Sequence, residues 1–261
     1  MNRLRILVFG GVFSYRALFG WLSPWILVPS LVVTPVAQIL LFAYLGRSAG
    51  VRDDDFFVIG NAFLYGAIPC LFGMTSTVVG ERLRGTLGMI LASPAPRLAL
   101  LLGRSLPVLV NGFGVAIFGL VVGGAVLGAG LPARALGPIV LAVLVSVCGC
   151  VGLGLVCAAI GLRFLDTGVL PNLFIGVLLI FSGANVPRDT LPAWMVQIGG
   201  WLPLTHGIEA ARRLAAGRSL GDVYQLLGAE LLLALAYGTV GALLLRTLEV
   251  RSRRAATLDL V

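Results

Sequence analysis

The chain has 261 residues, of which 59% are hydrophobic and 11% are charged. Soluble domains carry roughly 25% charged residues, so this composition excludes a water-soluble globular protein. The 19 basic residues are all arginines and outnumber the 11 acidic residues, which gives a net charge of +8. Because lysine is absent, the phosphate-binding motif GxxxxGK[ST] cannot occur, and any nucleotide hydrolysis must come from another chain.

The first residues of the chain are expected to lie on a membrane rather than across it. Residues 1–20 place Arg3, Arg5 and Arg16 among apolar residues, which is typical of an amphipathic helix in the membrane interface. Apolar stretches then recur along the chain and leave no polar block long enough for a soluble domain. We therefore predict one transmembrane domain over residues 1–261, all helical. Anionic headgroups account for the arginines, so no nucleic-acid partner is predicted.

Six segments are long and apolar enough to span a membrane. A hydrocarbon core of about 30 Å needs about 20 apolar residues in a helix, and the fifth segment is near the lower limit. Several segments contain proline, which membrane helices tolerate where neighbours satisfy the freed carbonyls. The predicted spans are residues 24–45, 56–79, 105–127, 137–161, 168–184 and 226–246.

Residues 191–208 are the ambiguous segment, because they are long enough for a seventh span. Pro192 and Pro203 bracket this segment and a glycine pair interrupts it, which favours a re-entrant or surface hairpin. With six spans and a cytoplasmic N-terminus, twelve arginines lie inside and seven outside. A seventh span changes these numbers to eleven and eight, so the positive-inside rule favours six spans by a small margin.

The connection between the second and third spans, residues 81–97, contains a candidate docking helix. We expect Glu81 to begin this helix, where a carboxylate favours the positive end of the dipole, and to pair with Arg84. Leu83 and Leu87 belong to an apolar stripe at helical spacing, and prolines then end the helix. A short helix of this kind is suited to a groove on a partner protein.

The predicted spans contain amides but almost no charge. Proton or sodium coupling usually requires a buried ionisable residue, and the spans offer only Glu230 and Arg104, both expected near span ends. The energy for any transport is therefore expected to come from outside this chain. The amides inside the spans are Gln38, Asn61, Asn111 and Asn172.

Other reactive residues do not form a catalytic or metal-binding pattern, so no catalytic residue, metal ligand or cofactor site is predicted. His206, the single histidine, has no nucleophile or carboxylate at triad-like spacing. Glu209 with Arg212 and Arg213 predicts a self-neutralising amphipathic helix, and gating of the external mouth is the alternative. Asp53 to Asp55 are expected in a solvated loop. Packing is the predicted role of Cys70, Cys148, Cys150 and Cys157.

Three blocks of the sequence resemble one family. GERLRGTLGMILASPAPR, residues 80–97, resembles the E-R-x-x-G-T-L-x-x-L-x-x-[ST]-P element of type-2 ATP-binding-cassette (ABC) exporter permeases. FSGANVPRDTLPAWMVQIGGWLPLTHGIEAARRLAAG, residues 181–217, resembles the family's F-S-G-x-x-x-P-x-x-x-L-P-x-W stretch and the L-P-L-T-H/Y element that follows it. Residues 14–47 are similar to the start of drug-efflux members. Together these blocks extend over essentially the whole chain.

This resemblance implies six spans, an N-terminal interfacial helix, a cytoplasmic coupling helix and an external re-entrant hairpin between spans five and six, within residues 185–222. The implied partners are two ABC ATPase subunits, which would bind ATP and Mg²⁺, and a second permease copy, identical or paralogous. The implied coupling residues are Glu81, Arg82, Arg84, Gly85, Thr86 and Leu87. The implied hairpin residues are Pro187, Leu191, Pro192, Trp194, Leu202, Pro203 and Leu204.

The implied function is export of an amphipathic substrate, drug-like or lipid-linked, across a bacterial cytoplasmic membrane, with both termini cytoplasmic and no bond chemistry in this chain. A polysaccharide or glycolipid permease of the same family is the alternative. An ATP-independent secondary transporter or channel is disfavoured because internal repeats and deep charges are absent from the sequence. On spans one, two and five, the predicted substrate route consists of Gln38, Phe42, Asn61, Tyr65 and Phe174.

Overall fold

The computed structural model describes residues 33–50, 54–85, 97–128, 130 and 132–255. Within these ranges the regular structure is entirely helical and includes no β-strand, in agreement with the predicted fold class. The interfacial helix predicted for residues 1–20 lies outside the described residues. Thr86 and Leu87 of the predicted coupling element also lie outside them.

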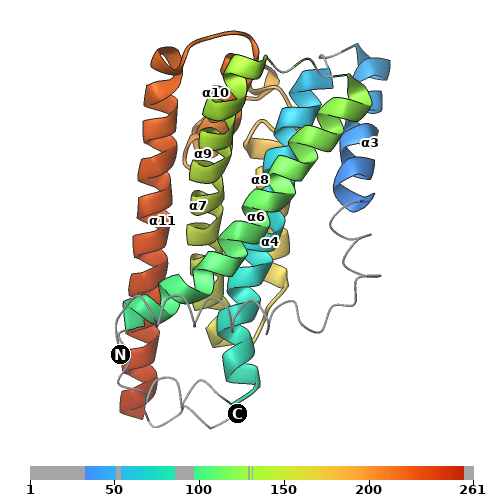
Figure 1. Cartoon of the computed structure of the whole chain (residues 1–261). Coiled ribbons are helices and arrows are strands. Elements are labelled where there is room, and N and C mark those ends of the chain that lie inside the picture. The colour runs from blue at the N-terminus through green and yellow to red at the C-terminus, as the bar shows by residue number, and fades with distance from the viewer. Residues whose placement is uncertain (1–32, 51–53, 86–96, 129, 131, 256–261) are drawn as a thin grey trace.

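Helices run alternately up and down a bundle (Figure 1). These helices are α3 (Thr34–Ala49), α4 (Asp54–Leu83), α6 (Arg97–Leu127), α7 (Ala133–Phe164), α8 (Val169–Phe181) and α11 (Leu220–Ala255). Between α8 and α11 lie the 3-10 turn η2 (Arg188–Thr190), α9 (Ala193–Gly200) and α10 (Thr205–Ala215). In Figure 1, α3 and α6 end and α4 and α7 begin at the upper end of the bundle, and the lower end carries the end of α4 and the α7–α8 connection.

Four of the predicted spans have a counterpart that is long and apolar enough to cross a membrane. Among the described residues these helices are Asp54–Leu83, Gly103–Leu127, Ala133–Phe164 and Leu220–Leu248. The fifth predicted span, residues 168–184, is shorter than expected, because α8 has 13 residues and the chain turns at Gly183, where φ is +81°. The first predicted span is described only from residue 33, and its helix α3 has 16 residues.

Glycines bring α4 into close contact with α6 and α7. A Cβ atom on Gly66 would lie 2.8 Å from the Ala116 Cβ atom, and one on Gly154 would lie 2.7 Å from the Cys70 carbonyl oxygen. Such close approach of backbones is how small residues stabilise membrane helix pairs. As a result α4 lies at the centre of the bundle, and its residues 57–67 are all buried.

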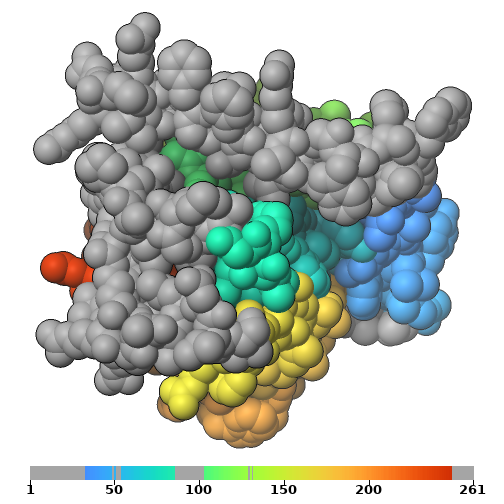
Figure 2. Space-filling view, turned by 90° about the horizontal axis from the view of Figure 1, so that it is seen from below, coloured from blue at the N-terminus to red at the C-terminus, as the bar shows by residue number. Residues whose placement is uncertain are grey.

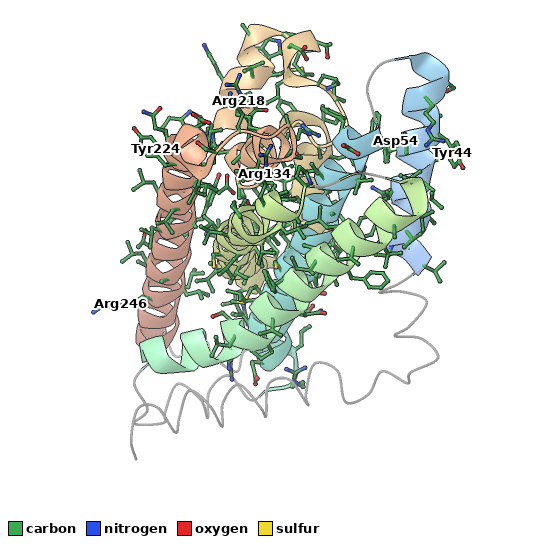
Figure 3. All side chains as sticks on the ribbon, turned by 45° about the horizontal axis from the view of Figure 1, so that its top comes forward. Tyr44, Asp54, Arg134, Arg218, Tyr224 and Arg246 are labelled. Carbon is green, nitrogen blue, oxygen red and sulfur yellow. The ribbon has the colours of Figure 1, made fainter. Side chains whose placement is uncertain are left out.

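In contrast, α11 packs on α7 along one face only. A Cβ atom on Gly152 of α7 would lie 2.8 Å from the Gly238 nitrogen of α11. Lower on the same helix, Arg246 projects away from the bundle (Figure 3). An apolar surface with an arginine near its end fits hydrocarbon bordered by anionic headgroups. The opposite face of α11 exposes Leu231, Leu232, Leu235, Val240 and Leu243.

Residues 191–208 form two helices rather than one. The first, α9, ends at Gly200, and α10 begins at Thr205 after a turn in which Leu204 has φ of +76°. A continuous seventh span is therefore excluded. The turn lies deep along α11, because its backbone contacts Glu230 and Tyr237. These two residues lie about 15 Å and about 25 Å from the start of α11, at a rise of 1.5 Å per residue.

Candidate functional site

The last turn of α4, at the lower end of the bundle, contains part of the predicted coupling element. Glu81 and Arg82 are helical residues of α4, which continues through Leu83. Arg84 and Gly85 follow, and Gly85 ends the helix in the left-handed conformation with φ of +69°. The prediction that Glu81 begins a helix is therefore wrong. The signal was misleading because a carboxylate usually marks a helix start, whereas here buried apolar residues keep α4 helical up to this point.

Glu81 joins α4 to α6 through an ion-pair cluster. The Arg104 Nη2 atom lies 3.2 Å from the Glu81 Oε1 atom, and these side chains are 18% and 17% exposed. The Arg84 Nη2 atom lies 3.7 Å from the same oxygen, so the predicted i,i+3 pair is confirmed. A carboxylate near a helix C-terminus is unfavourable, and the two guanidinium groups offset this cost. The sequence did not predict the partnership with Arg104.

A second link joins α4 to α7 at the same end. The Arg82 guanidinium donates a hydrogen bond to the Leu162 carbonyl oxygen in the last turn of α7. A Cβ atom on Gly161 would lie 3.3 Å from the Val79 side chain, so the two helix ends are in contact. Figure 2, seen from below, places the end of α4 beside the beginning of α8. The end of α4 is thus tied to both α6 and α7.

The predicted hairpin residues lie along the connection from α8 to α10. Trp194 lies in the first turn of α9, and its ring is 6.0 Å from the Phe181 ring at the end of α8. Trp201, which was not predicted, is 74% exposed. Pro187 precedes η2, Leu191 and Pro192 lead into α9, and Leu202, Pro203 and Leu204 form the turn before α10. We call residues 201–204 the hairpin tip.

A buried carboxylate from α11 caps the N-terminus of α10. The Glu230 side chain is fully buried and accepts hydrogen bonds from the backbone N–H groups of Leu204 at 2.7 Å, His206 at 3.2 Å and Gly207 at 3.2 Å. An acidic group is favourable at this end of the helix dipole. The prediction that Glu230 lies near a span end is wrong, because α11 starts at Leu220, six residues before the predicted span.

Arg212 fastens the other end of α10 to α4 and to the turn after α8. Its guanidinium donates to the carbonyl oxygens of Gly183 at 2.8 Å, Ala184 at 3.0 Å and Phe56 at 3.0 Å, and it stacks 3.4 Å above the Phe56 ring. The neighbouring Arg213 makes the predicted i,i+4 ion pair with Glu209, at 2.8 Å. Arg212 thus has a specific anchoring contact that an amphipathic helix does not require.

Three of the five predicted substrate-route residues lie together at the α3–α4 contact. The Tyr65 hydroxyl donates to Gln38 at 2.6 Å, Gln38 donates to Asn61 at 3.4 Å, and Asn61 donates to Asn185 at 2.7 Å. This polar cluster connects two helices to the turn after α8. The remaining two residues, Phe42 on α3 and Phe174 on α8, are half-buried.

An apolar cavity of about 220 Å³ lies between α6 and α7, away from this polar cluster. Leu120 and Ile139 form its buried wall, and Val121 and Val140 lie at its exposed rim. None of the predicted substrate-route residues lines this cavity. It offers van der Waals contacts without any charged side chain.

The sequence missed the roles of Glu230, Arg212 and Arg104 for a common reason. Each side chain binds a segment 23 or more residues away, so local spacing carries no signal for the contact. The one signal in the sequence was that charged residues are rare in the predicted spans, because a single carboxylate in an apolar helix needs a polar partner.

Helices α10 and α7 approach each other closely at Gly207 and Ser146. Gly207→Ala is expected to destabilise the hairpin, because a Cβ atom there would overlap the Ser146 Oγ atom. The loss should be about 1–3 kcal/mol, as for other overpacked sites. Adding Ser146→Ala should recover most of it, since the Ser146 Cβ atom would lie 3.2 Å away. Thermal unfolding of the two single variants and the double variant in detergent measures the coupling, and purely additive effects would contradict this explanation.

The long apolar helices and their apolar outer surface define a multi-pass helical membrane protein. The model of the ABC-2 type transporter family matches residues 9–215, and the chain belongs to this family. Family membership makes it the transmembrane subunit of an ABC transporter rather than the ATPase, and implies an ABC ATPase subunit as partner. The match ends before α11. A search of curated proteins gave no match.

Proposed function

We propose that this chain is the permease of an ABC exporter that moves an amphipathic substrate, drug-like or lipid-linked, out of the bacterial cytoplasm. Two permease copies would assemble with two ATPase subunits, which bind ATP and Mg²⁺. The family match supports the permease role and the ATPase partner. The direction of transport, the number of permease and ATPase copies and the substrate class are proposed in addition to what the family match supports.

The lower end of the bundle is the proposed cytoplasmic end. Arginines concentrate at the end of α4, at the start of α6 and in the last turns of α11, and these helix ends lie at the lower end in Figure 1. Excess arginine on the cytoplasmic side is the usual determinant of orientation. The residues concerned are Arg82 and Arg84 at the end of α4, Arg97 and Arg104 at the start of α6, and Arg246, Arg251, Arg253 and Arg254 in α11.

The observation that carries this proposal is the connection of the α4 end to two other helices. Glu81 is paired with Arg104 of α6, and Arg82 is hydrogen-bonded to α7. Force applied by an ATPase to the segment after α4 would therefore reach the central helix and two of its neighbours together. Packed helices transmit such displacements as small rigid shifts. In this proposal Glu81, Arg82, Arg84 and Gly85 belong to the coupling element.

An amphipathic substrate fits the polarity of the bundle. The polar cluster of Gln38, Asn61 and Tyr65 supplies hydroxyl and amide groups next to otherwise apolar helices. Phe42 lies one helical turn after Gln38 on α3 and could contact an apolar part of the same solute. Small-molecule sites are typically mostly apolar with a few polar groups, and this part of the bundle has that composition.

Gly85 provides the test of the coupling proposal. Gly85→Leu should leave the membrane level unchanged, because no atom of the described residues lies within 4 Å of a Cβ atom at this position. It should nevertheless lower transport-coupled ATP hydrolysis by about tenfold, because a leucine cannot readily adopt φ of +69° and the exit from α4 would be redirected. ATP hydrolysis and uptake of a fluorescent amphiphile are measured in inverted vesicles that contain the permease and its ATPase.

Gly85→Asn is the matched control, because asparagine tolerates the left-handed conformation and should retain most of the coupling. Glu81→Ala, which removes the link to α6, should behave like Gly85→Leu. Full activity in both Gly85→Leu and Glu81→Ala would refute the assignment of this segment as the coupling element.

A further inference from the structure

The hairpin tip is held by two side chains on one face of α11. Glu230 accepts hydrogen bonds from the backbone around Leu204, and the Tyr237 hydroxyl donates to the Trp201 carbonyl oxygen at 2.9 Å. Glu230 and Tyr237 are seven residues apart, so they lie two turns apart on the same side of the helix. The two contacts thus fix both sides of the tip to α11.

Glu230 acts where the backbone of the tip is strained. Leu204 has φ of +76° and ψ of −31°, a conformation that residues with a side chain rarely adopt. The Leu204 N–H group makes the shortest of the three bonds to Glu230. A strained residue persists only where its surroundings hold it in place. The Glu230 carboxylate supplies this restraint, since it binds the strained residue and the first turn of α10 together.

Two hydrogen bonds within the hairpin, between η2, α9 and α10, do not involve α11. The His206 Nε2 atom lies 3.0 Å from the Gly200 carbonyl oxygen, which joins α10 to the end of α9. The Arg188 guanidinium donates to the Val196 carbonyl oxygen at 3.2 Å. Loss of the contact with Glu230 should therefore release the Leu204 side of the tip from α11, while Tyr237 still holds the Trp201 side and α9 and α10 stay folded.

We propose that Glu230 is a positioning residue that sets the location of the hairpin tip, so that the tip and α11 move as one unit during transport. The position of the tip follows from the contacts described above. Only the statement about transport depends on the proposed function.

A cysteine reporter tests the position of the tip. Ser146 of α7 is fully buried beneath Gly207 at the start of α10, so Ser146→Cys should be protected from a membrane-impermeant maleimide. The four native cysteines are replaced by alanine, and the protein is studied in lipid nanodiscs. In this background Glu230→Gln should raise the labelling rate of the reporter by about tenfold or more, because the amide cannot replace a carboxylate that accepts three N–H groups.

Two controls separate release of the tip from general loosening. Thr75→Cys, a fully buried position on α4 remote from the hairpin, should keep its slow labelling in the Glu230→Gln variant. Glu209→Gln makes the same chemical change on the outer face of α10 and should leave both cysteines protected. The proposal is overturned if Glu230→Gln does not accelerate labelling at position 146, or if it accelerates labelling equally at position 75.

Joint movement of the tip and α11 during transport is tested by a separate measurement. With the ATPase present, Glu230→Gln should lower the amount of amphiphile transported per ATP hydrolysed, while ATP hydrolysis itself continues. A purely structural role would reduce both quantities in proportion. An unchanged ratio together with a released tip would refute the link between tip position and transport. The labelling experiment contains no ATPase, so its outcome is independent of the proposed export function.

Discussion

Arg212→Met is expected to lower the free energy of unfolding by about 3 kcal/mol or more. The Arg212 guanidinium donates to three carbonyl oxygens from two other segments, and methionine would leave these oxygens without that partner in an apolar environment. The stacking on Phe56 would also be lost. Unfolding in mixed micelles measures the change, and proteolysis of the α8–α10 connection reports whether the hairpin has separated from α4.

The adjacent Arg213 offers a matched control. Its side chain is exposed and its ion pair with Glu209 is a surface pair, so Arg213→Met should cost less than about 1 kcal/mol. Arg212→Lys should fall between these values, because an ammonium group is a compact donor and cannot reproduce the planar fork of a guanidinium. Equal destabilisation by Arg212→Met and Arg213→Met would mean that the anchoring contacts contribute little.

The sequence predicted those elements whose signal is local. Long apolar runs gave α4, α6, α7 and α11, because hydrocarbon requires about 20 apolar residues whatever the neighbouring helices are. The prolines at 192 and 203 correctly indicated that residues 191–208 are not one helix. In each case the physical cause lies within a few residues, so it can be identified without a structure.

The features that sequence did not predict depend on contacts between distant segments. Glu81 was expected at a helix start because the rule for carboxylates considers one helix, whereas Arg104 of α6 stabilises it at a helix end. The depth of the hairpin tip depends on Glu230, which is 26 residues beyond Leu204. The apolar cavity between α6 and α7 arises from the crossing of two helices and has no motif at all.

Exchange of the charges at the lower end should show whether the Glu81–Arg104 pair transmits force. Glu81→Arg places a third positive charge beside Arg84 and Arg104, and repulsion between two such groups at 4 Å is on the order of 4 kcal/mol in a partly buried site. The side chains will separate, and the end of α4 will lose its link to α6. Transport-coupled ATP hydrolysis should then fall by about tenfold or more, measured in vesicles with the ATPase.

Adding Arg104→Glu to Glu81→Arg restores an ion pair of reversed polarity, so the double variant should regain most of the coupling. Arg246→Ala is the control for a change of net charge at the lower end, and its effect should be small because that exposed side chain projects away from the bundle and lies outside the coupling element. If the double variant remains as inactive as Glu81→Arg, the carboxylate at position 81 acts by direct contact with the ATPase rather than through α6. Restored activity instead places the function of Glu81 in the connection between the two helices.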